Sequence, residues 1–236
     1  MSRRIAAWGV HLATGLGAVA ALLAVEAGTR SDWRAAMGWM VAAMVIDSCD
    51  GTLARRLDVR RRLPSFDGAL LDNIVDYLNY VFVPAFLLLR ADLVPARTEW
   101  LAASAILLSS GYQFCQDDAK TDDHFFKGFP SFWNVAVLYM LVLDGHPVGN
   151  LTVLLLLALA VFVPVHWAYP SRMQRLRGLT LALTALWGAS VAAIVWNWPE
   201  VPRWLVLGSS LYLAYYGAIS LYLSLRRAPA ADRGEP

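Results

Sequence analysis

The chain has 236 residues, of which 58% are hydrophobic and 16% are charged, and its formal net charge is +2 at pH 7. An ordinary soluble domain has about a quarter of its residues charged, so this composition excludes a typical soluble globular protein and indicates a membrane protein. The weak net charge also gives no reason to expect nucleic acid as a partner.

Apolar runs of the length that crosses a bilayer, about 20 residues, follow one another along the chain. They predict an all-α polytopic membrane protein with about eight transmembrane helices. The fifth run is short and carries Asn134, so six or seven crossings with a re-entrant piece remain an alternative. The expected spans cover residues 7–27, 33–56, 69–90, 98–116, 131–144, 148–168, 177–198 and 203–225.

The chain contains no internal repeat and no hydrophilic segment long enough for a second domain. Residues 1–226 are therefore expected to form a single integral membrane domain, followed by a disordered cytoplasmic tail at 227–236. With the eight spans above, most of the 20 arginine and lysine residues fall on the side that carries the N-terminus. Because positive charge accumulates in cytoplasmic loops, both termini are expected in the cytoplasm.

Four aspartates interrupt the second and third apolar runs near their expected cytoplasmic ends. Asp47 and Asp50 are three residues apart, and Asp72 and Asp76 are four apart, so each pair shares one face of its helix. Two antiparallel helices can point these carboxylates at one another, where they would repel and become protonated unless cations compensated them, so the cluster favours a metal site. Oxygen ligands alone suit Mg²⁺ or Mn²⁺. An ion transporter with acids inside the membrane is the alternative interpretation.

The aspartates belong to a longer pattern of fixed spacing. The stretch DSCDGTLAR, followed after a spacer by GALLDNIVD, resembles the signature D-x-x-D-G-x-x-A-R…G-x-x-x-D-x-x-x-D of the CDP-alcohol phosphotransferases. The spacer, residues 56–67, is longer than in most of that family. Every fixed position of the signature is filled, by Asp47, Asp50, Gly51, Ala54, Arg55, Gly68, Asp72 and Asp76.

This resemblance implies the family's membrane fold, a homodimer and a set of site residues. It implies two divalent cations, Mn²⁺ or Mg²⁺, held by Asp47, Asp50, Asp72 and Asp76. Asp76 would also be the catalytic base that takes the proton of the acceptor alcohol. Contacts with the CDP group are expected from Asp47, Gly51, Ala54, Arg55 and Gly68.

A narrower resemblance runs from about residue 11 to residue 177. The stretch HLATGLGA near the start, the long spacer, and SGYQFCQDDAKTDDHFFKGFPSFWN at 110–134 resemble the bacterial branch of the family that makes phosphatidylcholine. Those enzymes join choline to CDP-diacylglycerol and release CMP. The resemblance therefore implies a transferase of phospholipid biosynthesis in the bacterial inner membrane, with its active site facing the cytoplasm. Serine or an ethanolamine-type alcohol is the alternative acceptor.

The segment 112–134 combines aromatic rings with carboxylates, as a choline site requires. A quaternary ammonium has no N–H donor and is recognised by ring faces and nearby negative charge. Aromatic residues of a membrane interface, together with solvated acids, are the alternative interpretation. The expected choline contacts are Tyr77, Tyr80, Tyr112, Asp117, Asp118, Phe125, Phe126 and Trp133.

Arg60, Arg61 and Arg62 form a basic run beside the expected membrane surface. Attraction to anionic lipid headgroups, with a role as a topology signal, is the favoured interpretation of this run. Direct contact with a substrate diphosphate is the alternative.

Overall fold

The computed structural model describes residues 2–119, 125–143, 145–163, 165–168 and 176–226, so the expected tail at 227–236 lies outside the described residues. The described chain is mostly helical, which confirms the all-α prediction. Its longer helices are α1 (Ser2–Thr29), α2 (Trp33–Arg56), α4 (Gly68–Asp76), α6 (Glu99–Phe114), α7 (Trp133–Leu143), α8 (Pro147–Ala160), α9 (Arg177–Asn197) and α10 (Arg203–Arg226).

Short elements complete the described part of the chain. A π-helix, η1 (Tyr77–Phe82), and helix α5 (Val83–Leu88) continue α4 without a break, and α3 (Val59–Arg62) is a single turn between α2 and α4. Two strands, β1 (Phe125–Lys127) and β2 (His166–Ala168), pair antiparallel with Phe126 opposite Trp167. Strand β2 packs against α10.

Three helices of the described residues, α1, α9 and α10, are long and apolar enough to cross a bilayer by themselves. Helical segments occupy all eight places expected from the sequence. Helices α7 and α8, however, have 11 and 14 residues, fewer than the ~20 that span a hydrocarbon core. The chain is thus a multi-pass membrane protein, and the number of eight crossings stays a prediction.

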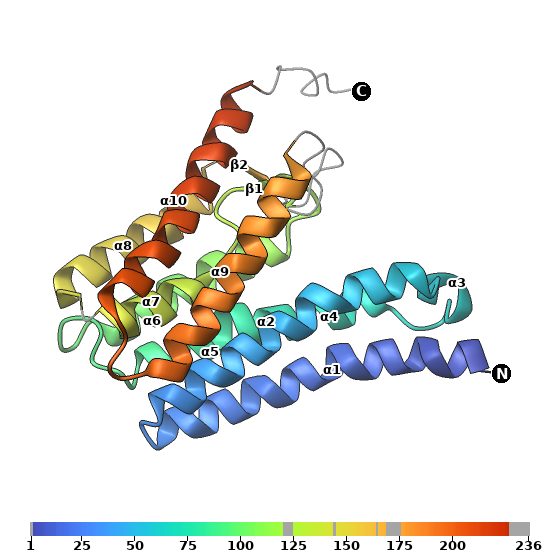
Figure 1. Ribbon diagram of the computed structural model, residues 1–236, viewed down its shortest axis with the longest axis horizontal. Coiled ribbons are helices and arrows are strands. Elements are labelled where there is room, and N and C mark those ends of the chain that lie inside the picture. Colours follow the sequence, from blue (N-terminus) through green and yellow to red (C-terminus); the bar gives the residue numbers. More distant parts are fainter. Residues whose placement is uncertain (1, 120–124, 144, 164, 169–175, 227–236) are drawn as a thin grey trace.

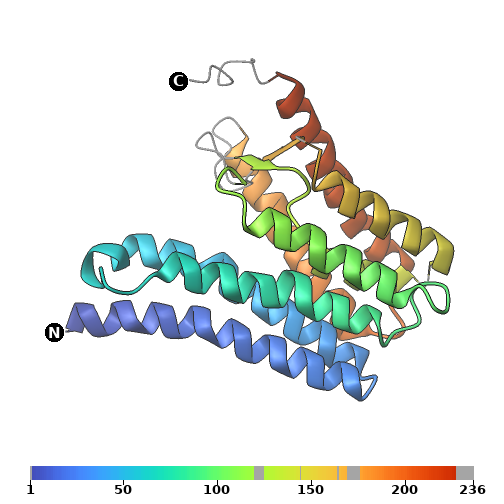
Figure 2. The same cartoon turned by 180° about the vertical axis from the view of Figure 1, so that it is seen from behind.

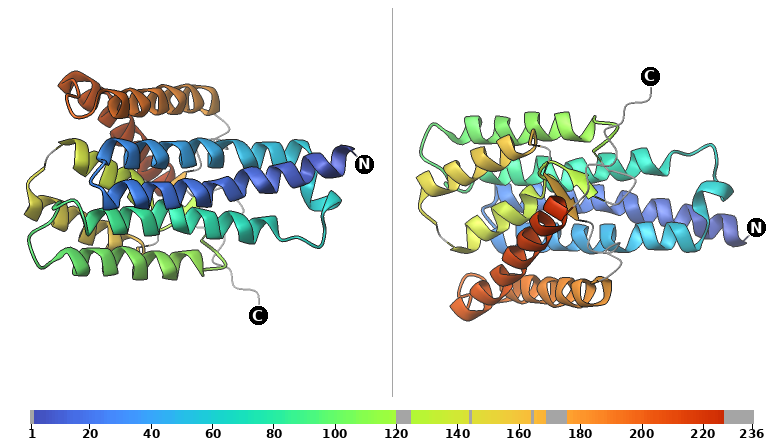
Figure 3. Two further views of the ribbon diagram at one scale, coloured as in Figure 1. Left: turned by 90° about the horizontal axis from the view of Figure 1, so that it is seen from below. Right: turned by 90° about the horizontal axis from the view of Figure 1, so that it is seen from above.

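Helices α1 and α2 and the continuous α4–η1–α5 segment lie side by side, as Figures 1 and 2 show. Helices α9 and α10 cross this group at a steep angle in the same views. Figure 3 shows that α6 and α8 lie beyond the α4–α5 segment, away from α9. The connection between α2 and α4, which carries α3, lies at the end of the bundle where α1 begins (Figure 1).

Small residues on α1 allow the first helices to pack closely. Ala20, Ala24 and Ala27 are buried and spaced by three or four residues, so they form one face of α1. Lipid is as apolar as a leucine side chain, and helices in a membrane therefore associate mainly through close van der Waals packing. The central core contains larger buried residues from α2, α5, α6 and α7, including Met37, Met40, Leu87, Leu88, Ile106 and Trp133.

The third long helical segment changes its winding in the middle. The spacing of Gly68, Asp72, Asp76 and Tyr80 predicts one α-helical stripe, but residues 77–82 form a π-helix, with the Val83 N–H bonded to the Leu78 carbonyl. Proline at 84 explains the difference, because it has no N–H to donate to the carbonyl four residues earlier. The wider turn accommodates that missing hydrogen bond.

Gly128 joins β1 to the segment that enters α7, and its conformation requires glycine. Its φ is +78°, and a Cβ built on it would lie 2.1 Å from the Val161 carbonyl oxygen. The Gly128 N–H donates to the Val165 carbonyl, just before β2, at 2.9 Å, and the Phe129 N–H donates to the Ala160 carbonyl at 3.1 Å, so this segment is tied to the end of α8 and to β2.

We expect Gly128→Ala to destabilise the protein by at least about 1–3 kcal/mol, because the methyl group would strain the backbone and displace the end of α8. The measurement is thermal unfolding in detergent, followed by tryptophan fluorescence. Gly149→Ala in α8 is the matched control, since a Cβ there meets nothing within 4 Å and alanine favours the helix. Equal unfolding temperatures for the two variants would contradict the prediction.

Candidate active site

Three carboxylates from two helices meet near the end of the bundle. Asp47 and Asp50 on α2 and Asp72 on α4 each place one oxygen within 4.8 Å of the others. Asp50 is buried, with 6% of its surface exposed. Anions at this spacing in partly buried surroundings repel one another, and either protonation or a bound cation relieves this repulsion. Since all the donor atoms are carboxylate oxygens, the cluster can hold a hard divalent cation.

Asp76 lies one turn further along the same helix. Together with Asp47, Asp50, Asp72 and Tyr80 it borders a pocket of about 10 Å³, enough for roughly one water-sized group. The group of three that lies within 4.8 Å does not include Asp76. The structure therefore brings the four signature aspartates to one pocket, with Asp76 beside the closest three.

Two hydroxyl groups orient carboxylates of this cluster. The Tyr80 hydroxyl donates to Asp47 Oδ2 at 2.7 Å, and the Thr14 hydroxyl donates to Asp50 Oδ2 at 2.7 Å. Hydrogen bonds of this kind fix the rotamer of a metal-binding carboxylate and leave its other oxygen for the metal. Thr14 was not among the site residues predicted from the sequence. The one signal in the sequence that could have indicated it is a polar threonine among the small residues of HLATGLGA.

Helix α1 approaches the site closely because two glycines leave room for it. A Cβ on Gly17 would lie 2.5 Å from Val75 Cγ1, and a Cβ on Gly68 would lie 2.5 Å from His11 Cε1. The Asn79 side chain donates to the Gly17 carbonyl at 3.0 Å and secures the contact. The space that Gly68 leaves is thus partly filled by the imidazole of His11.

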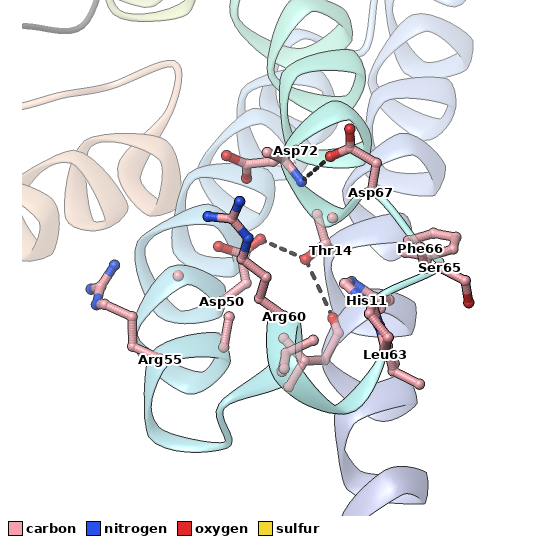
Figure 4. A pocket seen from close by; sticks show the side chains of 17 residues that line it. His11, Thr14, Asp50, Arg55, Arg60, Leu63, Ser65, Phe66, Asp67 and Asp72 are labelled. Atoms are coloured by element: carbon pink, nitrogen blue, oxygen red, sulfur yellow. Dashed lines mark hydrogen bonds between the residues drawn. The ribbon is translucent and has the colours of Figure 1, made fainter.

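A cavity of about 700 Å³ lies next to the carboxylates, between α1, α2, α3 and the start of α4. Figure 4 shows its lining side chains. Asp50 and Asp72 border this cavity as well as the small pocket, so the two spaces adjoin. Its volume falls in the range typical of sites for drug-sized ligands. Four signature residues outside the aspartates line it, namely Gly51, Ala54, Arg55 and Gly68.

The start of α4 is fixed beside this cavity. Asp67 is the N-cap, and its side chain accepts a hydrogen bond from the Ala69 N–H at 3.1 Å (Figure 4). The same oxygen also accepts from the Leu70 N–H at 2.9 Å. An N-cap of this kind satisfies donors that the first helical turn leaves unpaired. The cap therefore sets where α4 begins and hence where Asp72 lies.

Aromatic rings continue from the carboxylate cluster toward β1. The Tyr80 ring lies 6.1 Å from the ring of Phe132, and Phe132 lies 6.1 Å from Phe126, centroid to centroid. We call Tyr80, Phe126 and Phe132 the ring set. Two of its members are among the predicted choline contacts, whereas Phe132 lies outside that prediction although it belongs to the same aromatic segment.

Three other rings predicted to contact choline have different partners. The Tyr77 hydroxyl donates to the Leu107 carbonyl at 3.1 Å, and its ring faces Phe114 on α6. Tyr112 is 49% exposed and packs on Phe162. The indole N–H of Trp133, a fully buried residue, donates to Ser110 at 2.7 Å.

The remaining predicted choline residues lie at or near β1. The Phe125 ring contacts that of His166 across the strand pair, with centroids 6.2 Å apart. Asp117 is exposed. Asp118 forms an ion pair with Lys127, and the hydrogen bond from that lysine lowers the pKa of the Asp118 carboxyl.

Sequence comparison identifies the class of protein that this fold and site define. The profile of the CDP-alcohol phosphatidyltransferase family matches residues 10–165, and the chain belongs to this family of enzymes. The matched region contains the aspartates, the cavity and the ring set.

Individual members of the family that are similar to this chain over most of its length are phosphatidylcholine synthases. The chain is 42% identical over 234 residues to the phosphatidylcholine synthase of Legionella pneumophila, covering 96% of this chain and 90% of the relative. It is 39% identical over 221 residues to the phosphatidylcholine synthase of Pseudomonas aeruginosa, covering 93% and 92%. With the enzyme of the same name from Borreliella burgdorferi the identity is 32%, covering 94% and 96%.

Replacing Thr14 should weaken divalent-cation binding without changing the carboxylates themselves. We expect Thr14→Val, which keeps the shape of the side chain and removes the donor to Asp50, to lower cation affinity by about 10- to 100-fold, the usual effect of losing a hydrogen bond to a metal ligand. Manganese binding, followed by electron paramagnetic resonance, measures this directly. Thr14→Ser retains the hydroxyl and should stay close to wild type. Equal affinities for the valine and serine variants would show that the hydrogen bond has no such role.

Proposed function

We propose that this protein transfers the phosphatidyl group of CDP-diacylglycerol to choline, forming phosphatidylcholine and releasing CMP. The observation that carries the proposal is the meeting of the four signature aspartates in one pocket, beside a cavity of about 700 Å³. The names and high coverage of the relatives support the choice of reaction.

The larger cavity is proposed to receive the cytidine and diphosphate. Gly51 and Ala54 present little side chain there, so a ligand can approach the backbone of α2. Arg55 offers a planar set of N–H donors that suits phosphate oxygens. Gly68 and Asp47 complete the proposed set, Gly68 as part of the cavity lining and Asp47 from the adjoining pocket.

Asp47, Asp50, Asp72 and Asp76 are proposed to hold Mn²⁺ or Mg²⁺, with two ions as the family resemblance implies. When bound, such ions supply positive charge that neutralises the diphosphate and stabilises the departing CMP. The hydroxyl groups of Thr14 and Tyr80 hold Asp50 and Asp47 in the orientation that the carboxylate cluster requires.

Asp76 is proposed as the general base, because it borders the pocket next to the cluster without belonging to the closest three carboxylates. As the choline oxygen forms a bond to the phosphorus that carries diacylglycerol, Asp76 accepts the hydroxyl proton. The bond from that phosphorus to the bridging oxygen breaks, and CMP leaves with this oxygen. Positioning of the alcohol beside the phosphorus supplies much of the rate enhancement.

The ring set is proposed to bind the trimethylammonium group of choline. Faces of aromatic rings attract a quaternary ammonium, and the neighbouring carboxylates add negative charge. Tyr80 links both parts of the site, since its hydroxyl bonds to Asp47 while its ring faces Phe132. A choline held here would place its own hydroxyl near Asp76, which borders the same pocket as Tyr80.

We further propose that residues 1–226 form one domain of a homodimer in the bacterial inner membrane, with both termini and the active site facing the cytoplasm. The distribution of arginine and lysine supports this orientation. The lipid tails of the substrate stay in the bilayer, so the reacting phosphorus is held at the depth of the headgroups.

The decisive experiment uses purified protein in detergent with CDP-diacylglycerol, labelled choline and Mn²⁺ or Mg²⁺. Phosphatidylcholine and CMP should form in equal amounts, and a chelator should stop the reaction. Asp76→Asn should lower turnover by about 10²- to 10⁴-fold, as expected when a general base is lost, and should retain CDP-diacylglycerol binding. Asp58→Asn is the control, because Asp58 is exposed and asparagine tolerates its φ of +49°.

Two other results of this experiment would each favour a different function. Lipid product from serine or ethanolamine but none from choline would keep the family and reject the acceptor. Absence of any lipid product with either metal, together with cation flux in liposomes, would favour the transporter.

Acceptor recognition is tested by removing single rings. Phe126→Ala and Phe132→Ala should each raise the KM for choline by about 2- to 30-fold, which corresponds to a ring contact of roughly 0.5–2 kcal/mol, and should leave the KM for CDP-diacylglycerol nearly unchanged. Phe162→Ala is the control, since Phe162 is 55% exposed and packs on Tyr112. If neither variant changes the choline KM selectively, choline binds elsewhere.

A further inference from the structure

The long spacer between the two halves of the signature folds against α1. Val59 and Leu63 are buried, with 4% and 2% of their surface exposed, and they pack with Ala7 and Val10. The Arg62 side chain already has a partner near α3, because its Nε donates a hydrogen bond to the Leu57 carbonyl at 2.6 Å. The orientation of α3 relative to α1 and α2 is therefore fixed by packing.

This packing determines where the arginines of the basic run point. Successive residues of a helix are rotated by about 100°, so Arg60 cannot share the buried face of Val59 and Leu63. Arg60 lines the large cavity, whereas Arg61 and Arg62 are not among the described residues that line it. Figure 4 shows the Arg60 side chain extending from α3 over the part of the cavity that Asp50 and Asp72 border.

The signature arginine lies elsewhere on the cavity wall. Arg55 Nη2 donates to the Thr52 hydroxyl at 3.2 Å, and its side chain lies on the far side of Asp50 from Arg60's helix in Figure 4. The two guanidinium groups thus come from different elements, α2 and α3. A cation on the carboxylate cluster would bind only some of the oxygens of a diphosphate. The remaining oxygens can accept hydrogen bonds from a guanidinium group, whose planar set of N–H donors matches phosphate geometry.

We propose that Arg60 is a further diphosphate-binding residue, which the long spacer adds to the signature. Its guanidinium donates hydrogen bonds to phosphate oxygens of the CDP group from the α3 side of the cavity. This inference rests on the proposed function. It also separates Arg60 from Arg61 and Arg62, for which attraction to anionic lipid headgroups remains the proposed role.

The test compares Arg60→Gln with Arg61→Gln. Both variants remove one positive charge from the same short helix, so they change general attraction to a charged surface equally. The probe is CDP itself, measured by calorimetry with Mn²⁺ present in uncharged detergent, because this soluble nucleotide needs no lipid surface. Loss of a charge-assisted hydrogen bond should raise the Kd for CDP by about 10- to 100-fold in Arg60→Gln. Arg61→Gln should leave it unchanged.

The two variants should also differ in their steady-state kinetics. In mixed micelles, Arg60→Gln should raise the KM for CDP-diacylglycerol and leave the KM for choline nearly unchanged, and Arg60→Lys should recover part of the loss. Equal effects of the two glutamine variants, or an unchanged Kd in Arg60→Gln, would overturn the inference while leaving the proposed function intact. Wild-type protein that binds CDP but does not use choline would reject only the acceptor, and one that binds no CDP would reject both proposals.

Discussion

Repulsion among closely spaced carboxylates is the constraint on which the rest of this structure depends. Asp47, Asp50 and Asp72 bring oxygens within 4.8 Å of one another, and near a low-dielectric bilayer such charges interact far more strongly than in water. Two hydroxyl groups partly offset this repulsion by donating hydrogen bonds to the carboxylates, Thr14 on α1 to Asp50 and Tyr80 on η1 to Asp47. The donor set itself is chemically suited to a divalent cation, and the catalytic proposal follows from that suitability.

Helix α1 holds the two aspartate-bearing helices in place. Its alanine face packs closely, and Gly17 gives room for Val75 where α1 meets the third helical segment. Thr14 then reaches Asp50 from the same helix. Residues with no acid or base chemistry of their own therefore determine whether the carboxylates meet, which is why α1 belongs to the carboxylate site as much as α2 and α4 do.

Composition, the apolar runs and the signature predicted the fold class. The signature also predicted the four aspartates of the pocket, because spacings of three and four fix which side chains share a face. Thr14 could not be predicted, since its partner Asp50 is 36 residues away and only packing brings them together. Pro84 is visible in the sequence and accounts for the π-helix, but a proline alone does not specify whether a helix kinks, ends or widens. Trp133 shows a further limit: its aromatic chemistry suits choline, yet tertiary packing buries it and directs its N–H to Ser110.

The adjoining pockets have a stereochemical consequence. Asp50 and Asp72 border both spaces, whereas Asp76 borders only the smaller one and Arg55 only the larger. The proposed placement of the nucleotide in one space and of the proton acceptor in the other would put the entering and departing oxygens on opposite sides of the reacting phosphorus. A single displacement with this arrangement would be in line, and it would invert the configuration at phosphorus without a covalent intermediate on the protein.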